Sequence, residues 1–183
     1  ADVAKTGLTP GLKGKRGIVQ GLGNVGYHAA LFLSQEDGAL ITHVLERDGA
    51  VVDEAGINID ALKSHINETG SVRGYSGYVD GGMEMLEADA DILIPAAMEL
   101  VITASNANRI RTPLIIEAAN GPVSADADAI LRDRGTVIIP DLYANAGGVT
   151  VSYFEWIKNL GRIRFGRMQR RAEETRFGAL IEG

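Results

Sequence analysis

RGIVQGLGNVG, residues 16–26, is the stretch of sequence that decides the fold of this chain. Its first five residues are a short run with the β-branched pair Ile18 and Val19, bounded by glycine, which predicts a buried strand. Val25–Ser34 has the apolar spacing of a helix. Between them, Gly21 permits a tight turn, Gly23 lets a ligand approach the backbone, and Gly26 allows close packing of helix on strand. Because a helix start offers unpaired N–H groups and a positive dipole end, the turn predicts a binding site for the pyrophosphate of a dinucleotide.

An acidic residue at the end of the next strand supports this prediction. Leu40–Glu46 is the second predicted strand, and Glu46 stands twenty positions after Gly26. A carboxylate there accepts hydrogen bonds from the adenosine ribose and repels a 2′-phosphate, which favours NAD. Arg47 either points into solvent or accommodates the 2′-phosphate of NADP, so NADP remains possible.

The rest of the chain alternates short apolar runs with helical patterns. Further strands are predicted at Asp91–Pro95, Leu114–Glu117 and Val137–Pro140, with a hairpin arm at Ala50–Asp53. Helices are predicted at Asp60–Glu68 (capped by Asp60 and stopped by Gly70), Met83–Ala88, Thr103–Ile110, Asp126–Arg134 and Val149–Leu160. This pattern indicates an α/β fold, a Rossmann-type doubly wound and mostly parallel sheet with helices on both faces and ligands at the carboxyl ends of its strands.

The sequence also suggests three parts. Residues 1–14 are rich in glycine and predict a linker, residues 15–160 the dinucleotide-binding domain, and residues 161–183 an arginine-rich C-terminal segment that we expect to be solvated.

Composition excludes several classes of function. A net charge of −6 argues against nucleic-acid binding, and the absence of cysteine excludes disulfides, a thiolate nucleophile and cysteine-ligated zinc. The histidines lack metal-ligand spacing, so no metal is expected. No apolar run approaches the roughly 18 residues that span a bilayer, so we expect no membrane span. The absence of cysteine suits a reducing compartment, so we expect a cytoplasmic location.

Three later segments have residue patterns that secondary-structure and composition rules do not account for. They are DILIPAA (residues 91–97), EAANGP (117–122) and PDLYANAGGVTVSYFEW (140–156). Together with GLGNVG they resemble the NAD(P)-binding domain of glutamate dehydrogenases, over about residues 12–171. Two positions depart from the family pattern: Leu22 replaces a usual aromatic residue, and Ala118 replaces a common glycine.

The resemblance implies roles for particular residues. Ala96 and Ala97 would lie along the adenosine side of the cofactor, Asn120 and Asn145 at the nicotinamide end, and Ser152 near the side-chain carboxylate of glutamate. The alternative for each polar residue is a purely structural role: an ordinary turn for Asn120, a turn or helix cap for Asn145, and a surface serine for Ser152. The complete set of expected cofactor contacts is Gly21, Gly23, Asn24, Val25, Gly26, Glu46, Arg47, Ala96, Ala97, Asn120 and Asn145.

The resemblance further implies reversible oxidative deamination of L-glutamate to 2-oxoglutarate and ammonia. In the family, the catalytic lysine and aspartate belong to a separate substrate domain, and no segment of this sequence resembles that domain. We therefore expect the chain alone to bind nucleotide without turnover. The resemblance also implies that the parent enzyme is a homo-hexamer, whereas the sequence leaves the oligomeric state of this chain open. Two alternatives remain: a related leucine, phenylalanine or valine dehydrogenase, and a non-catalytic NAD-sensing module.

Overall fold

The computed structural model describes residues 6–148 of the 183-residue chain. The chain divides into two units, residues 1–144 and residues 145–183, and the fold below is that of the first unit. The predicted helix at Val149–Leu160, Ser152 within it, and the arginine-rich segment lie outside the described residues. The domain boundary at residue 160 therefore stays a prediction.

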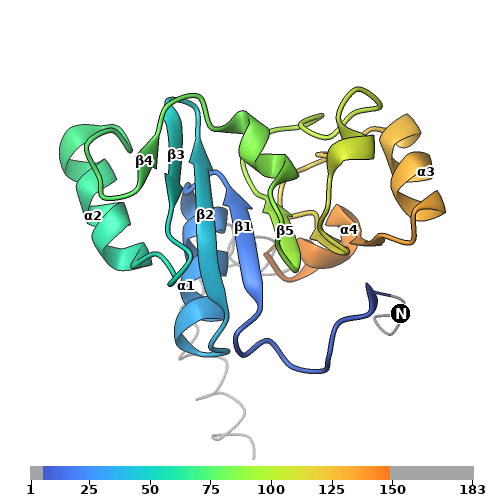
Figure 1. Ribbon diagram of the computed structural model, residues 1–183, viewed down its shortest axis with the longest axis horizontal. Helices are drawn as coiled ribbons and strands as arrows, with labels where there is room; N and C mark the ends of the chain where they lie inside the picture. Colours follow the sequence, from blue (N-terminus) through green and yellow to red (C-terminus); the bar gives the residue numbers. More distant parts are fainter. Residues whose placement is uncertain (1–5, 149–183) are drawn as a thin grey trace, which may run out of the picture. The chain divides into compact units, whose positions relative to one another are not determined.

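Within the described residues, seven strands form one sheet in the order β4-β3-β2-β1-β5-β6-β7. Their bounds are β1 Arg16–Gln20, β2 Leu40–Glu46, β3 Gly49–Val52, β4 Tyr78–Val79, β5 Ile92–Pro95, β6 Leu114–Ile116 and β7 Val137–Ile139. Strands β2, β1, β5, β6 and β7 are parallel, and β3 and β4 add an antiparallel edge beside β2 (Figure 1). The chain runs from β1 outward to β4 and then returns to β5 on the other side of β1. This reversal confirms the doubly wound α/β fold and directs attention to the carboxyl ends of β1 and β5.

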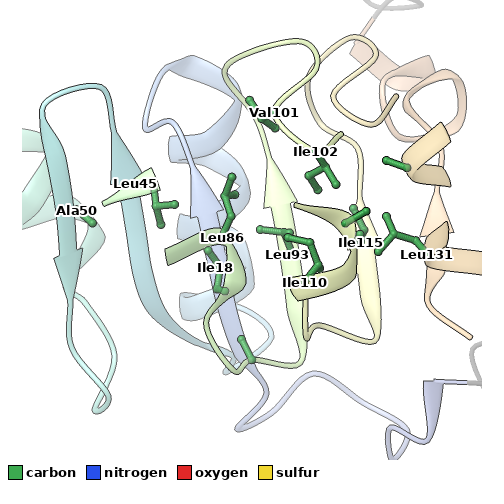
Figure 2. Packing of buried hydrophobic residues seen from close by; sticks show 13 residues of the cluster. Ile18, Leu45, Ala50, Leu86, Leu93, Val101, Ile102, Ile110, Ile115 and Leu131 are labelled. Carbon is green, nitrogen blue, oxygen red and sulfur yellow. The ribbon is translucent and has the colours of Figure 1, made fainter. Parts of the chain in front are cut away.

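Helices cover both faces of the sheet. They are α1 Asn24–Gln35, α2 Ile59–Thr69, α3 Ala125–Asp133 and α4 Asp141–Ala144, with the 3₁₀ turns η2 Met83–Glu87 and η3 Ala107–Arg109. Among the described residues, buried side chains form two apolar cores, because successive residues of a strand point to opposite faces. Ile18 of β1 joins the core beneath η2, η3 and α3 (Figure 2), whereas Val19 joins the core beneath α1 and α2.

The start of α2 differs from the sequence prediction. Asn58, not Asp60, is the N-cap, and its Oδ1 accepts the Ala61 N–H at 3.0 Å. Asp60 lies in the first helical turn, where its carboxylate accepts hydrogen bonds from α1 instead. The predicted stop is confirmed, since Gly70 ends the helix in the left-handed conformation with φ of +74°.

The helix predicted at Thr103–Ile110 is wrong. Only Ala107–Arg109 is helical, as a single 3₁₀ turn. Asn106 holds the segment in a loop, because its Oδ1 accepts the Thr103 N–H at 2.8 Å and its Nδ2 donates to the Val101 carbonyl at 2.9 Å. Such local bonds compete with helix formation.

Three shorter features also differ from expectation. The segment predicted as a helix at Met83–Ala88 is the 3₁₀ turn η2. The two-residue strand β4, which pairs Val79 with Ala50, and the four-residue helix α4 were not predicted. Both are too short to show an apolar period.

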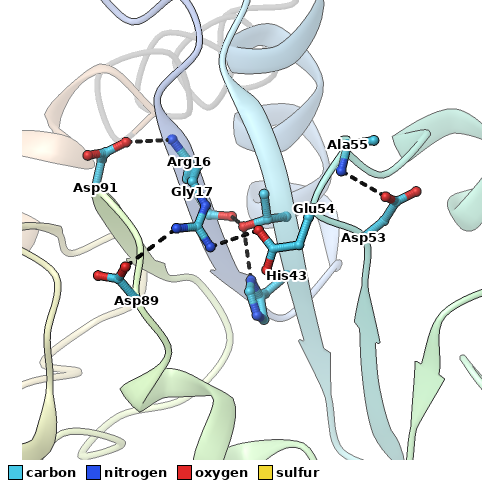
Figure 3. Close-up of polar contacts among 9 residues, drawn as sticks. Arg16, Gly17, His43, Asp53, Glu54, Ala55, Asp89 and Asp91 are labelled. Carbon is cyan, nitrogen blue, oxygen red and sulfur yellow. Dashed lines mark hydrogen bonds and ion pairs between the residues drawn. The ribbon is translucent and has the colours of Figure 1, made fainter.

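A polar cluster lies at the end of β1 opposite the glycine turn (Figure 3). The Arg16 backbone N–H donates to Asp91 at 2.8 Å, and its guanidinium pairs with Glu54 at 2.8 Å and with Asp89 at 3.6 Å. His43 lies nearby on β2, and its burial lowers the pKa of the imidazole. These contacts join the amino end of β1 to the segment after β3 and to the segment before β5, away from the candidate site.

Two further findings bear on the class of protein. No helix within residues 6–148 combines the length and the apolar character that crossing a membrane requires. In the same residues, no three histidine, cysteine, aspartate or glutamate side chains gather as metal ligands would.

Candidate functional site

Two glycines of the turn after β1 are required by packing alone. Gly21 has φ of +87°, and a Cβ added there would lie 2.3 Å from the Cβ of Ala97. A Cβ added at Gly26, in the first turn of α1, would lie 1.8 Å from the Gly21 carbonyl oxygen. A methyl group is therefore excluded at both positions, and α1 packs directly on the turn.

Gly23 is different, because nothing in the described protein occupies the space beside it. It is the N-cap of α1, with φ of −67° and ψ of −164°, and a Cβ added there would meet no atom within 4 Å. No side chain of the described residues caps the helix, and its first turn carries no acid. Asn24 and Val25, which open the helix, are exposed. The start of α1 thus presents N–H groups to an open space, which suits an anion.

Leu22, at the centre of the turn, is held by two charged side chains. Glu46, the last residue of β2, accepts the Leu22 N–H at 2.5 Å through Oε1. Lys63 of α2 donates from Nζ to the Leu22 carbonyl at 2.8 Å. The predicted ribose acid therefore reaches the glycine turn, while Arg47 is exposed in the turn between β2 and β3.

The end of β5 lies against the end of β1. Ala96 donates its N–H to the Gln20 carbonyl at 2.8 Å, and Ala97 donates to Gln20 Oε1 at 3.3 Å. These bonds bring the two alanines beside Gly21. The distance of 2.3 Å between a Cβ added at Gly21 and the Cβ of Ala97 also shows this proximity. Sequence reasoning missed the role of Gln20, although a polar residue that ends an apolar strand is a usable signal.

The loop that carries Asn120 is tied to its neighbours on both sides. The N–H groups of Ala118–Ala119 donate to the Pro95 carbonyl at 3.0 and 2.8 Å. On the other side, Gly121 donates its N–H to Asp141 Oδ2 at 2.9 Å. Asn120 itself is exposed between these anchors, one strand farther along the sheet than Ala96 and Ala97.

A buried carboxyl group supports the same loop. Glu117 accepts the Asp141 N–H through Oε2 at 3.0 Å, and burial raises the pKa of the Glu117 carboxyl. Asp141 in turn accepts the Leu142 N–H through Oδ1 at 2.6 Å. The ends of β6 and β7 are thereby joined beneath Asn120, an arrangement that the sequence analysis did not foresee.

The structure thus brings most of the predicted residues together at the carboxyl edge of the sheet. The turn, Glu46, Ala96 and Ala97 are connected by direct contacts, and Asn120 is connected to them through Pro95. Asn145 belongs to the second unit, where it is half-buried, and Ser152 lies outside the described residues.

Comparison with known proteins identifies the family. Residues 2–175 match the sequence pattern of the Glutamate/Leucine/Phenylalanine/Valine dehydrogenase family. The chain belongs to this family. The resemblance seen in the sequence is thereby confirmed.

Individual members of the family are similar to this chain over most of its length. The chain is 55% identical over 174 residues to a probable glutamate dehydrogenase of Sinorhizobium fredii, covering 91% of this chain and 39% of that protein. It is 48% identical over 150 residues to an NADP-specific glutamate dehydrogenase of Saccharolobus shibatae, covering 81% of this chain and 35% of that protein. The chain therefore spans little more than a third of the length of these dehydrogenases.

A solved structure agrees with the fold. A hetero-hexameric glutamate dehydrogenase from Thermus thermophilus, in its Leu-bound form, superposes with a TM-score of 0.77 at 28% identity. The match covers 98% of this chain and 42% of that chain. The Rossmann-like fold of the family is therefore present here.

Proposed function

We propose that this chain is the NAD(P)-binding domain of a glutamate dehydrogenase. The observation that carries the proposal is the open, uncapped start of α1 at Gly23, with Glu46 fixed beside it. Family membership and the similarity to named glutamate dehydrogenases support the same interpretation.

The residues present fit a dinucleotide. The N–H groups at the start of α1 would bind the pyrophosphate, and Glu46 has a second carboxylate oxygen, Oε2, for the ribose hydroxyls. Ala96 and Ala97 would line the adenosine side, with Asn120 and Asn145 at the nicotinamide end. Glu46 favours NAD, whereas exposed Arg47 and the NADP-specific relative from Saccharolobus keep NADP possible.

The role of this chain in the reaction is to bind and orient. When bound, NAD(P) supplies the hydride acceptor for reversible oxidative deamination of L-glutamate to 2-oxoglutarate and ammonia. Glu46 and the α1 start would fix the adenosine half, and the anchored Asn120 loop would set the position of the other half. Ser152 would contact the substrate carboxylate. The family also includes enzymes for leucine, phenylalanine and valine, so a comparison of these substrates in the whole enzyme decides among them.

Assembly and location belong to the same proposal. We propose that the whole enzyme is a homo-hexamer, which agrees in subunit number with the hetero-hexameric glutamate dehydrogenase of Thermus thermophilus. Sedimentation of the whole enzyme tests this. We also propose a cytoplasmic location.

Calorimetric titration with NAD and with NADP tests the nucleotide site. We expect the wild-type chain to prefer NAD, and Glu46→Gln to reduce that preference by roughly ten-fold, since a charged hydrogen bond contributes about 1.5–3 kcal/mol. Glutamine still has an oxygen to accept the Leu22 N–H, so the turn keeps its shape. Glu68→Gln, at an exposed glutamate of α2, is the control and leaves both affinities unchanged. Absence of binding to either nucleotide contradicts the proposal, and equal affinities in wild type and Glu46→Gln contradict the role of Glu46.

A turnover assay tests whether this chain binds nucleotide without catalysing the reaction. We expect the 183-residue chain to show no glutamate-dependent NADH formation, because the chain spans 39% of the Sinorhizobium relative and the family's acid–base residues have no match in it. Formation of NADH at a rate near that of a whole enzyme would contradict this expectation.

A further inference from the structure

We propose that Lys63 is a positioning residue that sets the direction of the peptide group between Leu22 and Gly23, and thereby directs the Gly23 N–H toward the cofactor pyrophosphate. This inference rests on the proposed dinucleotide site. It adds a residue on α2 that the glycine motif does not contain.

The first observation is that the backbone of Leu22 is bound at both of its polar groups. Its N–H donates to Glu46 at 2.5 Å, and its carbonyl accepts from Lys63 Nζ at 2.8 Å. Leu22 is buried, with 1% of its surface exposed, so these groups have side-chain partners in place of water. The carboxylate of Glu46 from β2 and the ammonium group of Lys63 from α2 thus hold one residue of the turn.

The second observation is geometric. The Leu22 carbonyl and the Gly23 N–H belong to one planar peptide group, and in a trans peptide they point in opposite directions. Fixing the oxygen on Lys63 therefore fixes the N–H of Gly23 on the other side. As the N-cap residue of α1, Gly23 contributes one of the N–H groups that have no partner inside the helix.

A restraint is useful at this point because glycine is conformationally permissive. Gly23 has no Cβ and no neighbour within 4 Å of where one would lie, so packing does not hold the peptide group from that side. Without Lys63, the peptide group can rotate before the ligand binds, and binding must then order it. A preorganised donor avoids that loss of entropy.

Lys63 is itself held in place. Its Nζ lies 5.8 Å from the centre of the Tyr27 ring, within the range of a cation–π contact. The Tyr27 hydroxyl donates to Asp60 Oδ1 at 2.7 Å, and Gln35 Nε2 donates to Asp60 Oδ2 at 2.8 Å. The packing of α1 on α2 therefore fixes the lysine that fixes the turn.

The competing role for a lysine here is direct binding of the 2′-phosphate of NADP. The two roles differ in which nucleotide they affect. The pyrophosphate is common to NAD and NADP, so a positioning residue affects both equally. A phosphate ligand affects NADP alone.

The test compares Lys63→Met with Lys15→Met. Methionine keeps a long apolar side chain against Tyr27 but removes the donor. Lys15 precedes β1 at the opposite end of the sheet, where its Nζ bonds Thr9 Oγ1 at 2.7 Å, so its variant removes the same charge far from the turn. Both variants are titrated calorimetrically with NAD and NADP, and the Gly23 amide is observed by ¹⁵N NMR in the free protein.

We expect Lys63→Met to weaken NAD and NADP by about ten-fold each, which corresponds to loss of one charged hydrogen bond. We also expect the Leu22 and Gly23 amide resonances to move while those of α3 stay. Lys63→Arg, which keeps a charged donor, restores at least part of both affinities. Lys15→Met changes none of these measurements.

Three results overturn the inference: a loss confined to NADP, unchanged affinity for both nucleotides, or amide shifts spread over the whole domain with a lower unfolding temperature. If wild type bound neither nucleotide, the proposed function would fail. The Gly23 resonance in free Lys63→Met would still decide whether Lys63 orients the peptide group.

Discussion

Gly23 and Gly26 stand three positions apart in one turn, yet a methyl group at each meets different surroundings. At Gly23 it enters open space with φ of −67°, a value that alanine adopts freely. We predict that Gly23→Ala lowers the free energy of unfolding by less than about 1 kcal/mol, because alanine is a poorer N-cap than glycine. The same change weakens NAD binding by ten-fold or more, because the methyl group occupies the place of the pyrophosphate. Calorimetry and thermal unfolding on the same sample measure the two effects.

Gly26→Ala provides the contrast. Its methyl group would lie 1.8 Å from the Gly21 carbonyl oxygen, so α1 must move away from β1. We expect a loss of about 1–3 kcal/mol in the free energy of unfolding, the usual cost of overpacking. If Gly23→Ala bound NAD as tightly as wild type, the open space beside Gly23 would not be the pyrophosphate site.

At the scale of elements, α2 matters because it carries Lys63 to the turn. Its first turn is capped by Asn58, whose side chain accepts the Ala61 N–H. We predict that Asn58→Ala lowers the free energy of unfolding by about 1 kcal/mol, the typical cost of losing an N-cap. Urea denaturation measures this change.

Asp60→Asn is the matched variant for that prediction. Asp60 is exposed, and its carboxylate accepts hydrogen bonds from Tyr27 and Gln35 rather than capping the helix. We expect a change within about 0.5 kcal/mol, as for most surface substitutions. If Asp60→Asn lowered the free energy of unfolding more than Asn58→Ala does, Asp60 and not Asn58 would be the N-cap of α2.

For the whole molecule, two buried titratable groups give opposite dependences of stability on pH. Burial lowers the pKa of His43 from its ordinary 6.5, so the unfolded chain binds the proton more readily and stability falls as pH drops through that value. Burial raises the pKa of Glu117 from its ordinary 4.5, so its contribution is fully present below that pH and is lost as pH rises through the raised pKa.

Glu117→Gln separates the two groups. Glutamine is neutral at every pH and still accepts the Asp141 N–H, so the variant avoids the cost of a buried charge. We predict that the stability of Glu117→Gln relative to wild type increases as pH rises from 4.5 toward neutrality, while the His43 dependence cancels in the difference. Thermal unfolding across that range measures it. A difference that is constant with pH contradicts a raised pKa in the folded state.

By itself, the sequence determined the class of fold and located the candidate site that we propose. The buried strands, α1, the hairpin arm and the stop of α2 at Gly70 were all predicted, because apolar period and glycine conformation are local properties of the chain. The glycine turn and Glu46 were found for the same reason, since a known spacing separates them. The order of the later motifs then indicated the family that the comparisons confirmed.

Only the tertiary structure decided how the site is held together. Lys63 binds Leu22 from 41 positions away, and Gln20 binds Ala97 from 77 positions away, so no local pattern relates these residues. The same holds for the Glu117 carboxyl, whose partner Asp141 lies at the start of α4 after the next strand. Asp60 and the loop at Asn106 were misjudged because a polar side chain near a helix start has several possible partners, and packing selects one of them. Local spacing in the sequence located the residues that we propose to contact the cofactor. The packing of α2 and β5 against the glycine turn decided which side chains hold those residues in position.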